Sequence, residues 1–371
     1  MGFIGSVVVP VLMSVVFWNV ENFYDYFDGK SSGSDTEFSS MGERHWTKKK
    51  FTDKTLMVGK TVLWAGCPEV IGLAEVENDF VLRRIAGSDV LRKSRYRYVH
   101  FESPDPRGID VALLYVADSL KKVVTYPVRI DSVRTRDILY VCLEHRRTGE
   151  RWHFFVNHHP SKYGGKQSEG KREMTMRKLK ASVDSLTAKG EERIIAMGDF
   201  NDVPSAPAFL IICNPPEKET IHSPDTTGPS KEIHRSRGRE IHRSRGKEIH
   251  RNREKGNGQP EIETDSLDKM GGQQNGGYKQ QTTGSHLVNL GKALEKTNRG
   301  SIRYRGNWQL IDNFLVSESL SGGAVMEILA PVFLVERDHQ WPGEKPKRTY
   351  IGPRYNGGVS DHLPVRLTIP Q

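Results

Sequence analysis

The sequence Ile194-Ile195-Ala196-Met197-Gly198-Asp199-Phe200-Asn201 joins an apolar run to a pair of polar residues. The apolar run predicts a buried strand. Successive side chains of an extended chain point to opposite faces, so Asp199 and Asn201 share one side and Phe200 faces the other. A carboxylate and an amide at a rigid strand end suit a hard cation and an anionic oxygen. A strand that ends in an ordinary polar turn also fits, because Gly, Asp and Asn all favour turns.

The rest of the chain alternates between many predicted strands and a few long helices. Strands are expected at residues 14–20, 68–76, 95–101, 109–116, 122–130, 137–145, 152–157, 301–306, 310–316, 325–334 and after 362. Helices are expected from Thr47 to about Gly66, at 79–86 and at 168–189, and a Pro/Gly-rich loop at 341–357. This pattern predicts an α/β fold: a two-sheet β-sandwich core flanked by helices, in four layers, α/β/β/α.

Residues 214–285 differ in composition from both flanks. A basic octapeptide beginning with Glu-Ile-His-Arg occurs at Glu232, Glu240 and Glu248, and the flanks of the repeats are rich in Gly, Gln, Thr and Pro. One isoleucine per repeat cannot build a core, so we interpret 214–285 as a disordered low-complexity insertion. Residues 1–213 and 286–371 are then expected to form one domain together.

The net charge of +9 is concentrated in that insertion. Residues 231–255 alone carry a net +6, so the basic balance does not predict a basic active-site face. The Arg/His repeats are either a tolerated expansion or a site for RNA or DNA phosphates.

Other bulk features bear on the compartment. No apolar run reaches the ~18 residues of a membrane span. The three cysteines show neither metal spacing nor a disulfide framework, which suits a reducing compartment, and we expect the cytoplasm. The apolar start, Met1 to Trp18, lacks a basic residue before its apolar run and continues into the first predicted strand. A signal peptide is therefore the less favoured alternative, and with it a secreted or periplasmic protein.

Polar residues stand at five predicted strand ends: Asn19, Glu75, His159, the Asp199/Asn201 pair and the Asp361/His362 pair. In addition, Asp312 lies inside the apolar run 310–316, where a carboxylate is costly unless it has a partner.

These residues stand in motifs that resemble the endonuclease/exonuclease/phosphatase superfamily, which includes deoxyribonuclease I, exonuclease III, sphingomyelinases and inositol polyphosphate 5-phosphatases. The matching segments are Phe17-Trp18-Asn19-Val20, Leu73-Ala74-Glu75-Val76, Val156-Asn157-His158-His159, Gly198-Asp199-Phe200-Asn201, Trp308-Gln309-Leu310-Ile311-Asp312 and Ser360-Asp361-His362-Leu363-Pro364. The second departs from the family pattern, because Ala74 stands where Gln is usual. The resemblance spans about 13–213 and 286–369, with six motifs in the family's order.

The resemblance implies a Mg²⁺ or Mn²⁺ ion, with Glu75 as its main ligand and Asp361 and Asn19 nearby. Carboxylate oxygens suit such a cation, which would polarise a phosphoryl oxygen.

The resemblance also implies the catalytic residues. His362, oriented by Asp312, would be the general base or an electrostatic stabiliser. Asp199 would orient or deprotonate the attacking water, Asn201 would bind a phosphate oxygen, and His159 would donate to the phosphate or leaving group.

Three further residues are open to two interpretations. Glu102 resembles a glutamate that pairs with a catalytic histidine in the family. It could instead be an ordinary acidic residue in a solvent-exposed loop. Arg107 could bind substrate phosphate or cap a turn. We expect His158 to be a spacer that points to the opposite face from His159.

We therefore expect a monomeric, divalent-metal-dependent phosphoester hydrolase, most simply a nuclease-type phosphodiesterase acting on DNA or RNA. A phosphatase or lipid phosphodiesterase would use the same site. The alternative from another class is a nucleic-acid-binding protein with a vestigial site.

Overall fold

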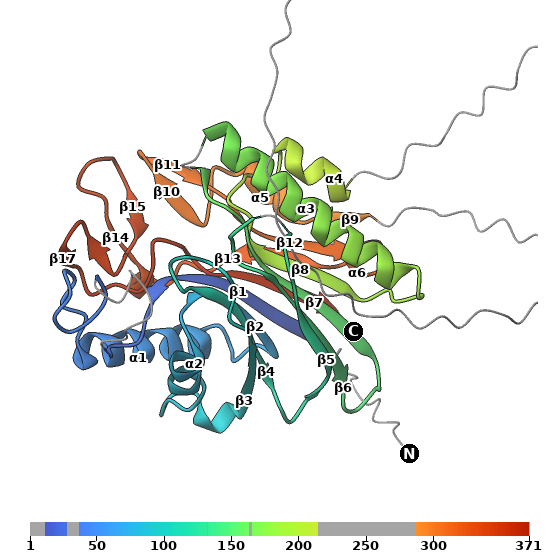
Figure 1. Ribbon diagram of the computed structural model, residues 1–371, viewed down its shortest axis with the longest axis horizontal. Helices are drawn as coiled ribbons and strands as arrows, with labels where there is room; N and C mark the ends of the chain where they lie inside the picture. Colours follow the sequence, from blue (N-terminus) through green and yellow to red (C-terminus); the bar gives the residue numbers. More distant parts are fainter. Residues whose placement is uncertain (1–11, 28–36, 132, 163–164, 214–285, 371) are drawn as a thin grey trace, which may run out of the picture. The chain divides into compact units, whose positions relative to one another are not determined.

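Two six-stranded β-sheets carry most of the strands in the computed structural model, which describes residues 12–27, 37–131, 133–162, 165–213 and 286–370 (Figure 1). Sheet 1 has the order β13 (Val325–Ile328), β18 (Val365–Pro370), β1 (Leu12–Phe23), β2 (Val70–Val76), β4 (Asp110–Val116) and β3 (Tyr96–His100). In it β1 runs parallel to β2 and antiparallel to β18.

Sheet 2 has the order β5 (Leu120–Val128), β6 (Ile138–His145), β7 (Arg151–His158), β8 (Ile194–Asp199), β12 (Asp312–Ser317) and β9 (Leu287–Asn289). Only β7 and β8 are parallel neighbours in it. The opening apolar run is therefore β8, a fully buried strand inside a sheet.

The two sheets pack face to face, and helices cover their outer faces (Figure 1). Phe17 of β1 and Met197 of β8 belong to the apolar layer between the sheets. Helices α1 (Lys48–Trp64) and α2 (Asp79–Ala86) cover sheet 1, and α3 (Gly165–Thr187) with α4 (Leu210–Cys213) covers sheet 2. The predicted two-sheet sandwich flanked by helices is thus confirmed.

Local sequence explains where the main helices begin and how they face the core. Thr47 caps α1, since its side chain accepts a hydrogen bond from the Lys50 amide, and Asn78 caps α2 in the same way. The stripe Met176, Leu179, Val183 and Leu186 of α3 is buried, as its helical spacing predicts.

Predictions of the later strands were partly wrong. The segment 301–306 belongs to a small hairpin of β10 (Ile302–Tyr304) and β11 (Asn307–Gln309). The segment 325–334 is a strand only to Ile328, because Pro331 then leads into a 3₁₀ turn, η4 (Val332–Leu334).

The remaining short elements are α5 (Gly291–Glu295), α6 (Glu318–Ser321), the 3₁₀ turns η1 (Arg92–Ser94) and η3 (Pro207–Phe209), β14 (Val335–Arg337) paired with β15 (Glu344–Pro346), and β16 (Tyr350–Ile351) paired with β17 (Arg354–Tyr355). Three of these strands lie in the segment 341–357, which was expected to be a loop.

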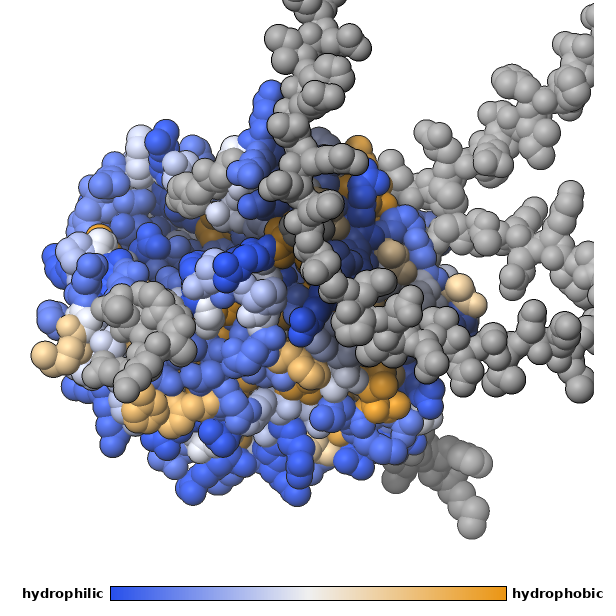
Figure 2. Space-filling model, in the orientation of Figure 1, coloured by the Kyte–Doolittle hydropathy of each residue, from blue (hydrophilic) through white to orange (hydrophobic). Residues whose placement is uncertain are grey.

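Segments on both sides of residues 214–285 contribute to the same sheets, since β12 pairs with β8 and β18 pairs with β1. The predicted insertion itself lies outside the described residues. Among the described helices, none is long and apolar enough to cross a membrane. The face shown in Figure 2 is mainly hydrophilic, with small separate apolar patches.

Candidate active site

A cleft of about 580 Å³ lies over the ends of β1, β2, β7 and β8. Its acidic and imidazole lining comprises Glu21, Glu75, Asp105, Asp199, Asp361, His158 and His362, and its basic lining comprises Arg107, Arg134, Arg136, Lys171 and Arg348. Asn19 and Asn201 also line it. The cleft therefore brings together most, but not all, of the predicted site residues.

Glu75 reaches the cleft because β2 is irregular at that residue. Its φ is +63°, and the pairing of β2 shifts register between Ala74 and Val76. Such a bulge re-aims a side chain, and the left-handed backbone is strained for a non-glycine residue. The carboxylate accepts a 2.7 Å hydrogen bond from the Asn22 amide and lies 3.8 Å from Arg107 Nη1.

Asp199 joins the two sheets at the cleft floor. Asn19 of β1 donates from Nδ2 to Asp199 Oδ2 (3.1 Å), and the Asn201 amide donates to Asp199 Oδ1 (2.8 Å). Asn201 has a φ of +51° and donates from its side chain to the His159 carbonyl (3.0 Å). Burial raises the pKa of Asp199 to about 7, against the lowering effect of nearby His362.

The predicted pairing of Asp312 with His362 is present. His362 Nδ1 lies 2.8 Å from Asp312 Oδ2, and both side chains are buried. The other ring nitrogen, Nε2, lies 3.9 Å from Asp199 Oδ2 and 3.9 Å from Asp361 Oδ1. Burial disfavours the charged form of the His362 ring, but the neighbouring Asp312 carboxylate favours it more strongly. Together with Asp199 and Asp361, Asp312 holds the pKa of His362 well above its ordinary value.

The expected orientations of the two adjacent histidines were wrong. His158 Nε2 lies 3.6 Å from Asp199 Oδ2 and 3.8 Å from Glu75 Oε1, so His158 faces the cleft. The reason is register, because His158 stands directly beside Asp199 on the parallel strands β7 and β8, and paired residues point to the same face. Burial, followed by Arg136, holds the pKa of His158 well below its ordinary value.

His159 points to the other side of the sheet. Its ring packs edge-on against Phe200, with centroids 4.9 Å apart, and its Nε2 lies 3.4 Å from Asn157 Oδ1. It does not line the cleft. Its catalytic role, predicted from the sequence, therefore lacks geometric support.

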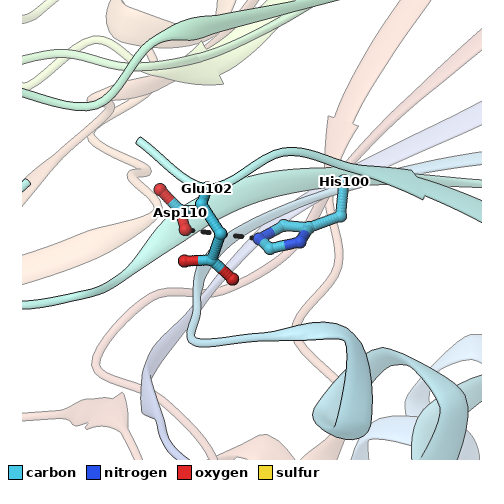
Figure 3. Close-up of side chains that lie close together, drawn as sticks. All are labelled: His100, Glu102 and Asp110. Carbon is cyan, nitrogen blue, oxygen red and sulfur yellow. Dashed lines mark hydrogen bonds and ion pairs between the residues drawn. The ribbon is translucent and has the colours of Figure 1, made fainter. Parts of the chain in front are cut away.

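Glu102 is also not brought into the cleft, although Arg107 is. Glu102 lies beside His100 and Asp110, near the line that joins His100 Nε2 to Asp110 Oδ2 at 3.3 Å (Figure 3). Glu102 lies in the loop after β3, and the residues of this loop that line the cleft are Asp105, Pro106 and Arg107. Its pairing with a catalytic histidine, expected from the resemblance, is not observed.

Sequence reasoning missed Glu21 and its partners. Glu21 accepts from Arg348 Nε (3.1 Å) and from the Thr349 amide (2.8 Å), and Arg348 also contacts Asp361 Oδ2 at 2.8 Å. Burial, followed by repulsion from Asp361, raises the pKa of Glu21 to about 7. The sequence feature that could have pointed to Glu21 as a site residue is its position two residues after Asn19.

Lys54 was missed as well. It is buried in α1, and its ammonium donates to the Glu21 carbonyl (2.5 Å) and to Thr349 Oγ1 (2.9 Å). Burial lowers the pKa of Lys54 to about 8, while Glu21, Glu75 and Asp361 oppose the shift. The sequence signal was a cation on an apolar helix stripe, three residues after Phe51 and four before Val58.

The predicted metal ligands fit a hard divalent cation. Glu75, Asp361 and Asn19 offer only oxygen donors, which is the preference of Mg²⁺ and Mn²⁺. All three residues line the same cleft. In a different group, ligand atoms of Asp199, Asp312 and His362 lie within 4.8 Å of one another. We interpret this group as a hydrogen-bonded chain, because Asp312 already holds the His362 Nδ1.

Comparison with known proteins agrees with this fold. The profile of the Endonuclease/Exonuclease/phosphatase family matches residues 14–218 and 260–371, so the chain belongs to this family of phosphoester hydrolases. No curated protein matches the chain.

Several solved structures resemble the chain at low sequence identity. A mannosyl-6-phosphatase of Bacteroides thetaiotaomicron has a TM-score of 0.51 at 13% identity, covering 97% of this chain and 100% of that chain. TDP2 of Caenorhabditis elegans has a TM-score of 0.51 at 10% identity, covering 97% and 75%. An endonuclease/exonuclease/phosphatase family protein of B. thetaiotaomicron has a TM-score of 0.50 at 14% identity, covering 97% and 98%. Such identities support the shared fold alone.

Proposed function

We propose that this protein is a divalent-metal-dependent phosphodiesterase whose substrate is nucleic acid. The observation that carries the proposal is the Asp312–His362 pair, which presents the His362 Nε2 to Asp199 at the floor of a cleft that Glu75 borders. Two acid–base groups and a metal-type carboxylate in one cleft are what hydrolysis of a phosphoester needs.

Each residue has a task that its environment supports. Asp312 accepts the Nδ1 proton of His362, so the ring presents Nε2–H to the cleft as a charged donor for the reacting phosphate. Asp199, with a pKa near 7, can take a proton from the attacking water.

His158 and Asn201 complete the proposed phosphate site. The low pKa of His158 keeps its ring neutral, and Nε2–H can then donate to a phosphate or leaving-group oxygen. Asn201 is held at the rim by its bond to the His159 carbonyl. When bound by Glu75, Asp361 and Asn19, a Mg²⁺ or Mn²⁺ ion would polarise the phosphoryl oxygen.

A nucleic acid substrate is supported by the basic residues that line the cleft, among which Arg107, Arg134, Lys171 and Arg348 can contact backbone phosphates. We also propose that the protein acts as a monomer. The cysteines Cys67, Cys142 and Cys213 are not paired with one another, which supports a reducing compartment such as the cytoplasm.

The test is hydrolysis of plasmid DNA, RNA, bis-p-nitrophenyl phosphate and p-nitrophenyl phosphate with Mg²⁺ or Mn²⁺. We expect cleavage of the diesters, loss of activity in EDTA, and weaker Mn²⁺ binding by Glu75→Gln in a metal titration. Glu102→Gln makes the same chemical change outside the cleft and should keep wild-type behaviour. Hydrolysis that EDTA leaves untouched would exclude the metal mechanism, whereas cleavage of p-nitrophenyl phosphate alone would indicate a phosphatase.

A further inference from the structure

A second hollow, of about 730 Å³, lies away from the cleft, between the edge strands β3 and β5 of the two sheets. Five basic residues line it, together with one acidic residue, Asp118: Arg95, Arg97, Lys121, Lys122 and Arg146. We call it the basic hollow. Tyr115 and Leu120 also line it.

Two of its cations lie where a sandwich normally places apolar side chains. Arg97 stands directly opposite Tyr115 on the neighbouring strand, and Tyr115 belongs to the layer between the sheets. Lys122 shares the face of Leu120, two residues earlier on β5, and Leu120 belongs to the same layer. The inner faces of both edge strands are therefore basic at this end of the sandwich.

Carboxylates neutralise only part of this charge. Arg95 pairs with Asp118 at 3.1 Å, and Lys121 lies 3.8 Å from Glu144. Within the described part of the chain, neither Arg97 nor Lys122 has a carboxylate within ion-pair distance.

A tyrosine hydroxyl adds a donor to the basic hollow. The Tyr115 residue is 6% exposed, and it lines the hollow together with Arg97 and Arg146. Arg97 stands opposite Tyr115 on the neighbouring strand. Burial raises the pKa of the Tyr115 phenol, and Arg97 and Arg146 oppose the shift. A ligand oxygen in the hollow can accept from this hydroxyl and from the guanidinium groups.

We propose that the basic hollow binds a ligand that carries phosphate groups, at a site separate from the cleft. Guanidinium and ammonium groups around one hydroxyl donor match the oxygens of a phosphate, and Arg binds them through two parallel hydrogen bonds. Tyr115 is paired with Val70, the first residue of β2, and Glu75 stands near the other end. At ~3.3 Å per residue, the two sites are roughly 17 Å apart along that strand.

The phosphate groups could belong to a free phosphorylated compound or to the backbone of a nucleic acid. Binding at the basic hollow does not depend on hydrolysis in the cleft. A purely protective role is the competing explanation, because inward-pointing charges on edge strands also prevent edge-to-edge association. Charge reversal separates these roles, since Arg97→Glu with Lys122→Glu keeps charged side chains on both edges while repelling an anion.

The experiment is calorimetric titration with sodium pyrophosphate in EDTA, comparing wild type with the Arg97→Glu/Lys122→Glu and Arg97→Gln/Lys122→Gln pairs. Lys189→Glu, at an exposed position outside both sites, changes the net charge by as much as the Gln pair does and is its control. We expect each pair to weaken pyrophosphate binding at least about tenfold. Lys189→Glu should bind pyrophosphate as the wild type does. Both pairs should keep cooperative unfolding and the hydrolysis of bis-p-nitrophenyl phosphate. Equal affinity in all four proteins, or no binding by wild type, would overturn the proposal.

A labelled single-stranded oligonucleotide then distinguishes the two sources. If nucleic acid occupies the basic hollow, the slope of log K against log salt should fall by ~0.7 for each phosphate that the Gln pair no longer binds. If only the pyrophosphate affinity falls and that slope is unchanged, the ligand is a free phosphorylated compound. Both results support the phosphate site.

Discussion

His158 and His159 are adjacent, yet only one of them can meet a substrate. Strand alternation turns one ring toward Asp199 and the other toward Phe200. The pairing of β7 with β8 determines which of the two rings faces the cleft. This pairing cannot be predicted from the sequence of either strand alone. The same local sequence would expose His159 if the register differed by one residue.

The first prediction compares these two histidines. His158→Gln should lower diester hydrolysis by ~100-fold or more, the usual range for loss of a hydrogen-bond donor to charge that develops in the transition state. His159→Gln should keep most of the activity, because its ring packs behind the sheet. The measurement is kcat and KM on bis-p-nitrophenyl phosphate for both variants. The reverse ranking would restore the assignment expected from the sequence.

The second prediction concerns pH and folding stability. Burial, followed by Arg136 and Arg172, lowers the pKa of His159 to about 3. In the unfolded chain the His159 ring binds a proton near pH 6.5, whereas in the native protein it stays neutral down to about pH 3. The contribution of His159 to the free energy of unfolding is therefore fully present above pH 6.5 and is lost as the pH falls toward 3. Each pH unit in that window costs about 1.4 kcal/mol for this one group. Urea unfolding at pH 7 and pH 5 should show a smaller loss for His159→Gln than for wild type, and equal losses would contradict the shift.

The third prediction treats Asp312 and His362 as one unit. His362→Ala should remove most activity, and Asp312→Asn should be nearly as severe because it removes the charge that stabilises the imidazolium. The double variant should be little worse than His362→Ala, since residues that act together are not additive. Rate losses that multiply in the double variant would show that the two residues act independently.

Much of the site could be predicted from residue types and strand ends, but not all of it. Asn19, Glu75, Asp199, Asp361 and His362 line the cleft, and the sequence placed them at predicted strand ends within motifs that resemble the family. The contacts of Glu21 with Arg348 and of Lys54 with Thr349 span 327 and 295 residues, so the local signals at Glu21 and Lys54 could not show that either residue belongs to the site.

At the scale of the elements, prediction succeeded where apolar periodicity was long. The strands β2, β4, β6 and β8 and the helix α3 lie close to their expected positions. The strands β15, β16 and β17 were missed because strands of two or three residues carry too few side chains for a period to be visible. The bulge at Glu75 was also invisible, since it is a feature of pairing with β4.

The fourth prediction uses a close approach between β7 and β8. A Cβ on Gly198 would collide with the backbone carbonyl of Asn157, which cannot move without shifting His158. Gly198→Ala should therefore cost about 1–3 kcal/mol in urea unfolding and also lower activity. Gly170→Ala in α3 meets nothing within 4 Å and should be neutral or slightly stabilising. Similar stabilities for the two variants would exclude this close packing.

At the scale of the whole molecule, we propose that residues 214–285 are dispensable for the fold. The two sides of the segment lie in contact, since α4, which ends at Cys213, packs against β9. A short connection can therefore join α4 to β9.

The fifth prediction is that a short Gly/Ser linker in place of 214–285 keeps cooperative unfolding and hydrolysis of bis-p-nitrophenyl phosphate. The segment offers few apolar groups to offset an ordering cost of about 1–2 kcal/mol per residue. Loss of soluble folded protein would show that the segment is structural. If the basic repeats bind nucleic acid, the same replacement should flatten the salt dependence of binding.

The placement of β18 beside β1 has a consequence for the time course of folding. The Trp18 indole donates to the His362 carbonyl across a sequence separation of 344 residues, and β1 has an open edge until β18 arrives. Contacts between residues that are far apart in the sequence form slowly during folding. Until β18 pairs with β1, the unpaired edge of β1 can associate with other chains. Asn19 lies on β1 and His362 just before β18, so hydrolysis should return after the helical signal when the denatured protein is diluted into buffer.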